Sequence, residues 1–421
     1  MKTVDKHDVR KNHQWYEYCR KITTASRCLY NACQYAQRLG YFYGHGIQSQ
    51  GSLDKLFHEN EHYQTMPAKV SQLVLQQNVS AWDSYFKSLK EYKKSPPKFT
   101  GKPKPPKYAN EFNLVKFNYQ AIGKGEFKKS WIVPSMSPIR IPVKPGMKFE
   151  NLCEVRIVPK TGCVVIEVVY ETAQPLAATL KPKLAAAIDI GLDNLATVVF
   201  NDLSIVPIIV NGKPLKSVNK FYNKQIAKYK GFLPPGVYSS HRLKNITRNR
   251  NNFVDSYIHQ SSKMLVDELV KLGVSQVAIG KNEQWKQSIN LGKKNNQSFV
   301  QVPHARFIEV LTYKLQQVGI QVTLGEESDT SRASFLDWDN IPTYTLHTNR
   351  KHQFSGKRVH RSWYISKNGI RIQADVNAAY NIGRKVIPIA FNVLRDRGCQ
   401  VVHPRRITPI FKCVHAEFGV A

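Results

Sequence analysis

The spacing of hydrophobic residues divides the first 180 residues into a helical part and a part rich in short strands. Apolar and aromatic residues recur at helical intervals from Gln14 to Phe42 and again from Ala68 to Tyr92, which predicts two long helices packed through these stripes. Between residues 110 and 180 the apolar runs are short, alternate with polar residues and end at Gly or Pro. This second pattern predicts a small antiparallel β-barrel.

The C-terminal half alternates apolar strands with helices. Lys183 to Phe200 contains two apolar runs joined by a turn through Gly191 and Asp193–Asn194, which predicts a β-hairpin. Three more strands are predicted at 203–210, 274–279 and 320–324, and helices at 213–230, 254–269 and 304–318. The tail after Pro388 is basic and is predicted to be loop-like.

Two aspartates stand out within this pattern. Asp189 ends the first strand of the predicted hairpin, where a buried strand has no structural need of a charge, and Asp375 opens a helical pattern in Ile372–Ile382. Taken alone, Asp189 is explained as a turn cap whose carboxylate accepts hydrogen bonds from backbone N–H groups. Taken together, a carboxylate that ends a central strand and one that opens a helix can meet around a divalent metal ion.

The charge balance predicts a polyanionic partner. The chain of 421 residues has 62 Lys and Arg against 30 Asp and Glu, a formal net charge of +32 at pH 7. Self-repulsion of this size destabilises a compact protein unless a polyanion screens it, so nucleic acid is the expected partner. A merely solvated basic surface is the alternative, and it needs a smaller excess of cations. The hydrophobic fraction of 42% is ordinary for a globular protein.

Membrane and export functions find no support in the sequence. No apolar run approaches the length of a membrane span, and the first fifteen residues contain no apolar signal core. The seven cysteines are scattered and include no C-x-x-C pair, so reduced thiols are the simplest interpretation. We therefore expect a cytoplasmic protein with no membrane partner.

Three basic stretches are candidates for contact with nucleic acid. The Pro-rich stretch 93–109 is predicted to be extended, so its lysines can follow a phosphate backbone; a stiff charged spacer is the alternative. The stretch 241–252 is cationic and has no acid, and a solvated helix face is its alternative. The stretch 328–373 mixes basic and aromatic residues, which can stack on bases and neutralise phosphates. The candidate residues are Lys98, Lys102, Lys104, Lys107, Arg242, Lys244, Arg248, Arg250, Lys357 and Arg358.

Three motifs in order resemble those of one protein family. Asp189–Ala196 resembles the first RuvC-type nuclease motif of the TnpB proteins encoded by insertion sequences, which are relatives of the small type V CRISPR effectors. Ala374–Ile382 resembles the third motif, and Val277–Gln287 is similar to the second-motif region of one TnpB subgroup. Three motifs in this order are a specific signal, and the resemblance covers nearly the whole chain.

The resemblance implies an α+β multidomain fold, in which a helical recognition domain and a small antiparallel β-barrel precede an RNase H-like (RuvC) α/β domain. In the family, the recognition domain contacts the guide RNA and the target duplex. The implied parts are the helical recognition domain (1–92), a basic Pro-rich linker (93–109), the wedge-like β-barrel (110–180), the first part of the nuclease domain (181–327), a basic insert replacing a zinc ribbon (328–373), the last nuclease helix (374–390) and a basic tail (391–421).

The resemblance also implies a metal-dependent active site. RuvC-type nucleases hold two divalent ions with three or four carboxylates, so magnesium or manganese is expected on Asp189, Asp375 and a glutamate. Most of the family carries this glutamate directly after the strand of the second motif. This chain has Gly280 at that position, so a glutamate from elsewhere must complete the site.

Three glutamates are candidates for the displaced ligand. Glu283 lies three residues beyond the expected position, whereas Glu326 and Glu327 end the strand that follows the next helix. The TnpB subgroup that this chain resembles uses a displaced glutamate of the second kind. We therefore expect Glu326 or Glu327 to complete the catalytic and metal-binding set, and the choice between them stays open. A solvated acidic turn is the alternative for this pair.

No zinc is expected. Many TnpB proteins carry two cysteine pairs before the final aspartate, because structural zinc takes four sulfur or imidazole ligands. Residues 328–373 contain no cysteine, and their histidines, His347, His352 and His360, are too few for a closed site.

Two functions follow from these residues and the resemblance. The first is an RNA-guided DNA endonuclease of the TnpB type, older descriptions of which are transposase or transposase accessory protein, with a guide RNA from the transposon end and target double-stranded DNA as partners. The alternative is a nuclease-dead RNA-guided DNA-binding protein, which Gly280 supports and the two aspartates oppose. An unguided RNA-binding protein explains the charge but leaves both aspartates without a role. Whether the chain is a monomer or a dimer stays open.

Overall fold

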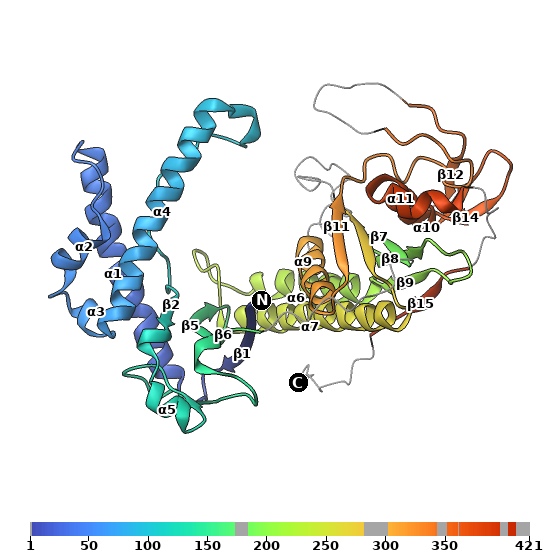
Figure 1. Ribbon diagram of the computed structural model, residues 1–421. Helices are drawn as coiled ribbons and strands as arrows, with labels where there is room; N and C mark the ends of the chain where they lie inside the picture. The colour runs from blue at the N-terminus through green and yellow to red at the C-terminus, as the bar shows by residue number, and fades with distance from the viewer. Residues whose placement is uncertain are drawn as a thin grey trace. The chain divides into compact units, whose positions relative to one another are not determined.

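The computed structural model describes residues 2–172, 184–281, 302–342, 352–360, 362–395 and 403–409. These residues form two compact units, within 1–173 and 174–421, each with a hydrophobic core of its own (Figure 1). The chain is a mixed α+β protein. Of the helices in these ranges, none is long and apolar enough to cross a membrane.

Two long helices organise the first unit. They are α1 (Tyr16–Phe42) and α4 (Ala68–Lys94), and they confirm the two helices predicted from helical spacing. Buried polar groups fix their register, because Gln34 Oε1 accepts hydrogen bonds from Asn78 Nδ2 at 2.9 Å and from the Trp82 indole N–H at 3.1 Å. The unit also contains the shorter helices α2 (Gln50–Phe57), α3 (Glu61–Gln64) and α5 (Lys124–Lys128) and the 3₁₀ turns η1 (Pro96–Lys98), η2 (Tyr119–Ala121) and η3 (Phe149–Asn151).

The last part of the Pro-rich stretch is hydrogen-bonded to α1. The carbonyl oxygen of Pro106 accepts hydrogen bonds from Gln34 Nε2 at 2.7 Å and Arg38 Nη1 at 3.1 Å. Asn31 exchanges two hydrogen bonds with the backbone of Ala109, at 2.8 and 3.0 Å. The end of the stretch is therefore a fixed part of the unit, and the stretch leaves Lys102, Lys104 and Lys107 exposed.

The strands of the first unit form an open sheet. Its order is β1 (Lys2–Val9), β6 (Cys163–Glu171), β5 (Leu152–Lys160) and β2 (Val115–Asn118), all antiparallel. The predicted closed barrel is not found among the described strands, because β3 (Trp131–Ile132) and β4 (Ile141–Pro142) are only two residues long and pair with each other. Sequence analysis also missed β1, whose polar alternation became a strand only by pairing with β6 along its whole length.

A six-stranded mixed sheet organises the second unit. The hairpin of β7 (Ala185–Asp189) and β8 (Asn194–Phe200) confirms the central prediction. The sheet order is β11 (Gln321–Gly325), β10 (Gln276–Gly280), β7, β8, β9 (Ile208–Asn211) and β15 (Arg405–Ile407). Strands β10 and β11 run parallel to β7, and β15 runs parallel to β9. The tail predicted to be loop-like thus supplies the sixth strand.

Helices cover the two faces of this sheet (Figure 1). The cores that the residues of β7 join show which residue faces which helix. Ala186 and Ile188 share a core with α7 (His241–Lys271) and α9 (His304–Gln317). Ala185 and Ala187 face the other way and share a core with α10 (Ala374–Val386). The remaining helices are α6 (Lys213–Lys230), α11 (Pro388–Phe391) and the 3₁₀ turn η4 (Asn392–Leu394).

The basic insert contains a small sheet that leads directly into α10. Its antiparallel strands are β12 (Lys357–His360), β13 (Trp363–Ile365) and β14 (Arg371–Gln373). Tyr364 anchors it, because its ring is fully buried and its hydroxyl donates a hydrogen bond to the Arg332 carbonyl at 2.8 Å. The first residue of α10 follows β14 without a break, so this sheet fixes where the helix begins.

Candidate active site

Asp189 lies at the carboxyl end of the central strand β7, on the face of the sheet that α10 covers. Strand alternation places it there, because Ala185 and Ala187 pack under α10 and Asp189 has the same parity. The turn that follows is supported by α9, since Nε2 of the buried His304 lies 3.1 Å from the Gly191 carbonyl oxygen. Sheet and helix therefore hold Asp189 in place.

Asp375 is the second residue of α10, at the amino end of the helix. Gln373 caps the helix by accepting a hydrogen bond from the backbone N–H of Val376 at 2.7 Å. Asn194, the first residue of β8, donates from Nδ2 to Asp375 Oδ2 at 2.6 Å. The helix amino end favours a negative charge, and Asn194 ties that charge to the hairpin that carries Asp189.

The carboxylates of Asp375 and Glu327 both lie within electrostatic reach of Asp189. The pKa of Asp189 is raised well above its usual value, first by burial and then by repulsion from Asp375 and Glu327. The guanidinium of Arg358 opposes this effect. Such mutual repulsion is the mark of a site that gains stability from a cation.

Gly280 provides the space for the Glu327 carboxylate. A β-carbon added at Gly280 would lie 2.5 Å from Glu327 Oε2 and 2.7 Å from Ile382 Cδ1 of α10. Gly280 pairs with Gly325 in the parallel register of β10 and β11, and Glu327 is two residues beyond Gly325. The Glu327 carboxylate, from the end of the neighbouring strand β11, therefore lies close to the position after β10 where the resembled family carries its glutamate.

Glu326 has a different environment from Glu327. Its Oε2 forms an ion pair of 2.5 Å with Nζ of Lys385, a side chain only 8% exposed, and its Oε1 accepts a hydrogen bond from the backbone N–H of Ser328 at 2.6 Å. Burial would raise the pKa of Glu326, but these bonds outweigh burial and lower it. Burial, followed by repulsion from Glu326, raises the pKa of Glu327 to about 7. The charge of Glu326 is thus neutralised by Lys385 of α10. Glu327 is the glutamate whose charge acts on Asp189.

The guanidinium of Arg358 lies beside the Asp375 carboxylate. Its Nη2 is 3.5 Å from Asp375 Oδ1, so the insert sheet delivers a cation to the same carboxylate that Asn194 holds. Sequence analysis grouped Arg358 with residues that contact nucleic acid, because its basic neighbours carry no signal of a position beside an aspartate. Only the packing of the insert sheet against α10 reveals it.

The donor set has the chemistry of a site for a hard divalent cation. Asp189, Glu327 and Asp375 supply carboxylate oxygens, the ligand type that magnesium and manganese prefer. The pocket that Gly280 leaves for Glu327 supports this fit. Within the described ranges, no group of three or more His, Cys, Asp or Glu is placed to hold a metal ion as it stands. The Asp375 carboxylate accepts a hydrogen bond from Asn194 and forms an ion pair with Arg358. Coordination of a metal ion by Asp375 therefore requires these side chains to move locally.

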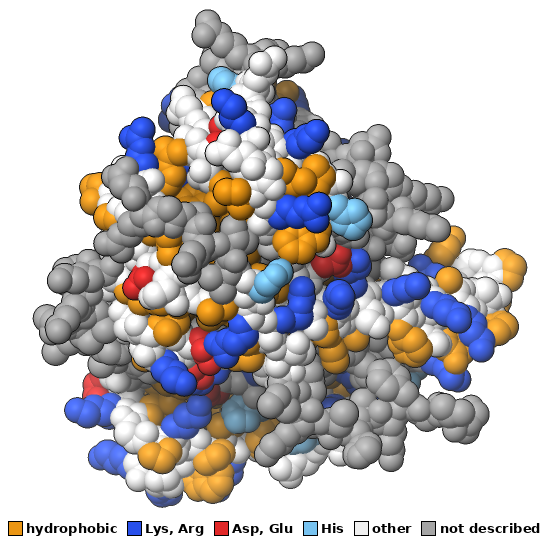
Figure 2. Space-filling model, turned by 90° about the vertical axis from the view of Figure 1, so that its right-hand side faces the viewer, with side chains coloured by type: hydrophobic (Ala, Val, Ile, Leu, Met, Phe, Trp, Pro, Cys, Tyr) orange, Lys and Arg blue, Asp and Glu red, His pale blue; other side chains and the backbone are white. Residues whose placement is uncertain are grey.

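The other cations that were predicted to contact nucleic acid differ in their surroundings, since some form contacts within the protein and others are exposed. Arg250 is used inside the unit, because its Nε donates to Asn219 Oδ1 at 2.8 Å and its guanidinium lies over Tyr222. Arg242 lies over the Tyr229 ring at 4.1 Å, and the exposed Lys98 pairs with Glu91 at 3.6 Å. Lys and Arg side chains far outnumber acidic ones on the face drawn in Figure 2. Lys244 and Arg248 lie in α7. Lys357 is exposed, and Glu283 and His347 lie outside the described residues.

Comparison with known proteins assigns these residues to recognised domains. Residues 166–286 match the family OrfB_IS605, described as "Probable transposase", and residues 304–382 match the "Cas12f1-like, TNB domain". The chain is 22% identical over 433 residues to "TnpB-like protein ORF457" of Acidianus two-tailed virus, a match that covers 93% of this chain and 88% of that protein. The chain is thus similar to a TnpB-like protein along nearly its whole length. Asp189 and Gly280 lie in the first matched region, and Glu327, Arg358 and Asp375 lie in the second.

Solved structures are similar to this chain at lower identity. One is the "Cryo-EM structure of the Cas12f1-sgRNA-target DNA complex", with 16% identity, a TM-score of 0.48 and coverage of 88% of this chain and 82% of that chain. Another is the "Crystal structure of AacC2c1-sgRNA binary complex", with 10% identity, a TM-score of 0.36 and coverage of 90% and 66%.

Proposed function

We propose that this chain is an RNA-guided DNA endonuclease of the TnpB type, with a RuvC-like active site built from Asp189, Glu327 and Asp375. The observation that carries the proposal is the meeting of three carboxylates at one sheet edge, two of them with a raised pKa, in a chain of net charge +32. Its partners are a guide RNA from the transposon end and double-stranded target DNA, which it meets in the cytosol.

Each residue has a distinct task in this proposal. Magnesium or manganese, when bound, activates water and stabilises the leaving oxygen of a phosphodiester. Asp189, Glu327 and Asp375 hold the ions, and Asn194 keeps Asp375 oriented toward the hairpin. Arg358 is near enough to Asp375 to neutralise a phosphate brought to that edge.

The nuclease-dead alternative loses its main support. It rests on Gly280, which removes the glutamate expected after β10. Because the carboxylate of Glu327 lies where a side chain at Gly280 would be, the glycine is compatible with a complete site. Three repelling carboxylates in one place also cost stability, which a protein without a metal has no physical reason to retain.

Cleavage of a matched plasmid is the direct test. The chain is expressed with the transcript that flanks its gene, purified with bound RNA, and given magnesium and a target beside a randomised flank. We expect a linear product that chelation by EDTA abolishes. Guide-dependent binding of the target with no cleavage in magnesium or manganese would support the nuclease-dead alternative.

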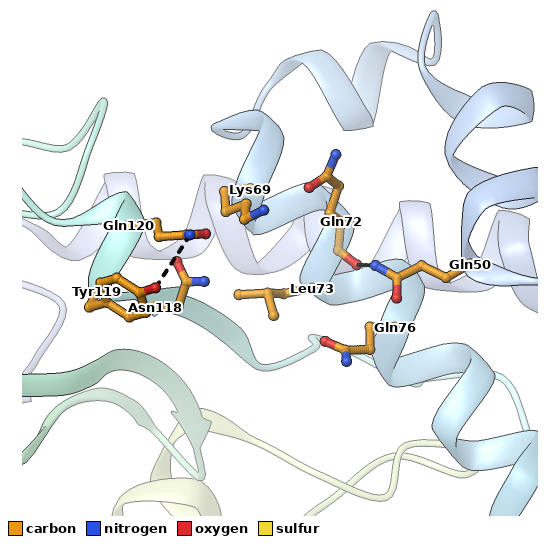
Figure 3. A pocket seen from close by; sticks show the side chains of 8 residues that line it. All are labelled: Gln50, Lys69, Gln72, Leu73, Gln76, Asn118, Tyr119 and Gln120. Atoms are coloured by element: carbon orange, nitrogen blue, oxygen red, sulfur yellow. Dashed lines mark hydrogen bonds between the residues drawn. The ribbon is translucent and has the colours of Figure 1, made fainter.

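A pocket in the first unit supports recognition of the flanking sequence (Figure 3). It has a volume of about 290 Å³, and its α4 side chains, Lys69, Gln72, Leu73 and Gln76, recur at helical intervals on one face. Across from them lies the exposed ring of Tyr119. Side-chain amides can pair with both hydrogen-bonding atoms of an adenine edge, and an aromatic ring adds contact area, so this pocket has the chemistry to read bases. Gln50, Asn118 and Gln120 complete the lining.

Replacing Gln76 with alanine is expected to relax the flank preference at one position. The Gln76 amide has no hydrogen-bond partner among the described residues, so it is available to a base. Loss of a paired contact is expected to reduce discrimination at that base by roughly 10-fold, the equivalent of about 1.4 kcal/mol. Sequencing of the flanks that are cut in the randomised library measures this. The control Ser80→Ala, one turn further along α4, should leave the preference unchanged, and an unchanged preference in Gln76→Ala would count against the pocket.

A further inference from the structure

A cavity of about 560 Å³ opens beside Asp375, and three of the stretches that line it are far apart in the sequence of the second unit. The turn after β7 contributes Gly191–Asn194, and the insert sheet contributes Trp363. The third stretch is the C-terminal strand β15 with the residues just before it. Arg406 of β15 pairs with Ile209 of β9, and both residues line the cavity. The tail therefore builds a wall of the candidate active site.

Trp363 forms the aromatic side of this cavity. Successive strand residues face opposite ways, and the next residue, Tyr364, is fully buried toward the core. Trp363 thus faces the cavity and keeps part of its surface accessible. Its ring meets His403 at a centroid distance of 6.1 Å and an angle of 85°, which is an edge contact and not a stack. A large aromatic side chain on a polar wall is available to a flat ligand.

Cations dominate the rest of the lining. Lys213 and Arg406 have no acidic partner within the described part of the chain, and Lys213 begins α6, whose amino end adds positive potential. The acidic Asp193 is neutralised by Lys216 across 2.6 Å. With Arg358, which is paired with Asp375, three cations line the cavity. It thus combines an aromatic wall with cations and ends at Asp375, a combination that suits a base joined to phosphates.

We propose that this cavity holds one nucleotide of a single strand next to the phosphodiester that is cut, with its base against Trp363 and its phosphates near Lys213 and Arg406. The inference rests on the proposed nuclease function for the identity of the neighbouring bond, but not for the binding itself. A base inside a duplex has both faces covered by its neighbours, so only an unstacked base can offer a face to Trp363. The site therefore selects a single-stranded substrate.

Binding of a short oligonucleotide tests the site without cleavage. The full chain, purified with its RNA and kept in EDTA, is titrated with a DNA hexamer that contains fluorescent 2-aminopurine, and an RNA hexamer forms the second arm. We expect quenching with the DNA hexamer, about 10-fold weaker binding in Trp363→Ala and near wild-type binding in Trp363→Phe. Lys213→Ala with Arg406→Ala should reduce the slope of log K against log salt by about 1.4. Trp131→Ala in the first unit is the matched control, and melting curves verify that each variant folds.

Cleavage of abasic substrates separates this inference from the proposed function. A base removed next to the cut should slow the wild type about 10-fold and have no further effect on Trp363→Ala, because the lost contact is the same one. Quenching that depends on Trp363 in a chain that cuts nothing would support the cavity and count against the nuclease. Efficient cleavage with equal rates at all abasic positions, together with DNA binding indifferent to Trp363 and to the two cations, would overturn the inference. Quenching with the RNA hexamer alone would also overturn it.

Discussion

Asp189→Asn is expected to abolish DNA cleavage and, at the same time, to make the folded chain more stable. Loss of a charged metal ligand should reduce the cleavage rate about 1000-fold or more, the equivalent of roughly 4 kcal/mol of transition-state stabilisation. Stability should rise because the pKa of Asp189 is raised well above its usual value by burial and by Asp375 and Glu327, so its charge is unfavourable in the folded state. Plasmid cleavage and thermal melting measure the two effects on the same preparation.

The sign of the stability effect can be checked with pH and with metal. A carboxyl group whose folded pKa is raised destabilises the fold above that pKa, so the advantage of Asp189→Asn should be present at pH 8 and shrink as pH falls and Asp189 becomes protonated. Magnesium should stabilise the wild type more than the variant, because binding to the folded state alone raises its stability. Asp202→Asn is a control just beyond the end of β8, since the Asp202 carboxylate accepts hydrogen bonds from Ser204 and lies outside the candidate site. A melting temperature that falls in Asp189→Asn would mean that the carboxylate is a turn cap.

Hydrophobic periodicity was sufficient to predict most of the second unit. The hairpin of β7 and β8, the helices α6 and α9 and the strands β10 and β11 all appear within a few residues of their predicted places. Their apolar runs are long and regular, and the sheet buries them on both faces. Strands β1 and β15 were missed because their sequences are polar and basic, and each is stabilised by the strand beside it and not by its own pattern.

The candidate site was predictable in part. Asp189 and Asp375 could be identified from the sequence because each is a charged residue at the end of an apolar pattern. Asp189 ends a buried strand, and Asp375 begins an apolar helix. The sequence left the choice between Glu326 and Glu327 open. The proposal of Glu327 rests on the structure, in which Gly280 and Gly325 are register partners and Glu327 has the parity of Gly325. The role of Arg358 could not be predicted, because it depends on how the insert sheet packs beside α10.

Glu327→Gln and Glu326→Gln are expected to have opposite consequences. Glu327→Gln should reduce cleavage about 100-fold or more while leaving the melting temperature unchanged or higher, because its pKa of about 7 reflects an unfavourable buried charge. Glu326→Gln should retain cleavage to within about threefold but lower the melting temperature, because Lys385 would lose its carboxylate partner while remaining buried. Equal loss of cleavage in both variants, with equal stability, would mean that the two glutamates share the metal site.

Moving the glutamate back to β10 is the sharpest test of the displaced ligand. In the double variant Gly280→Glu with Glu327→Gly, the new side chain starts from the point where the Glu327 carboxylate now lies, and the other close neighbour, Ile382 Cδ1, is the end of a flexible side chain that can yield. We expect cleavage at least about 10-fold above that of Glu327→Gly alone, since a carboxylate returns to the same end of the sheet. Gly280→Glu alone should be inactive, because its β-carbon would meet Glu327 Oε2 at 2.5 Å and a fourth carboxylate would enter the site. Gly280→Gln with Glu327→Gly fills the same space without the charge, so cleavage equal to that of the glutamate version would show that packing, and not a metal-binding carboxylate, is what the site requires from Glu327.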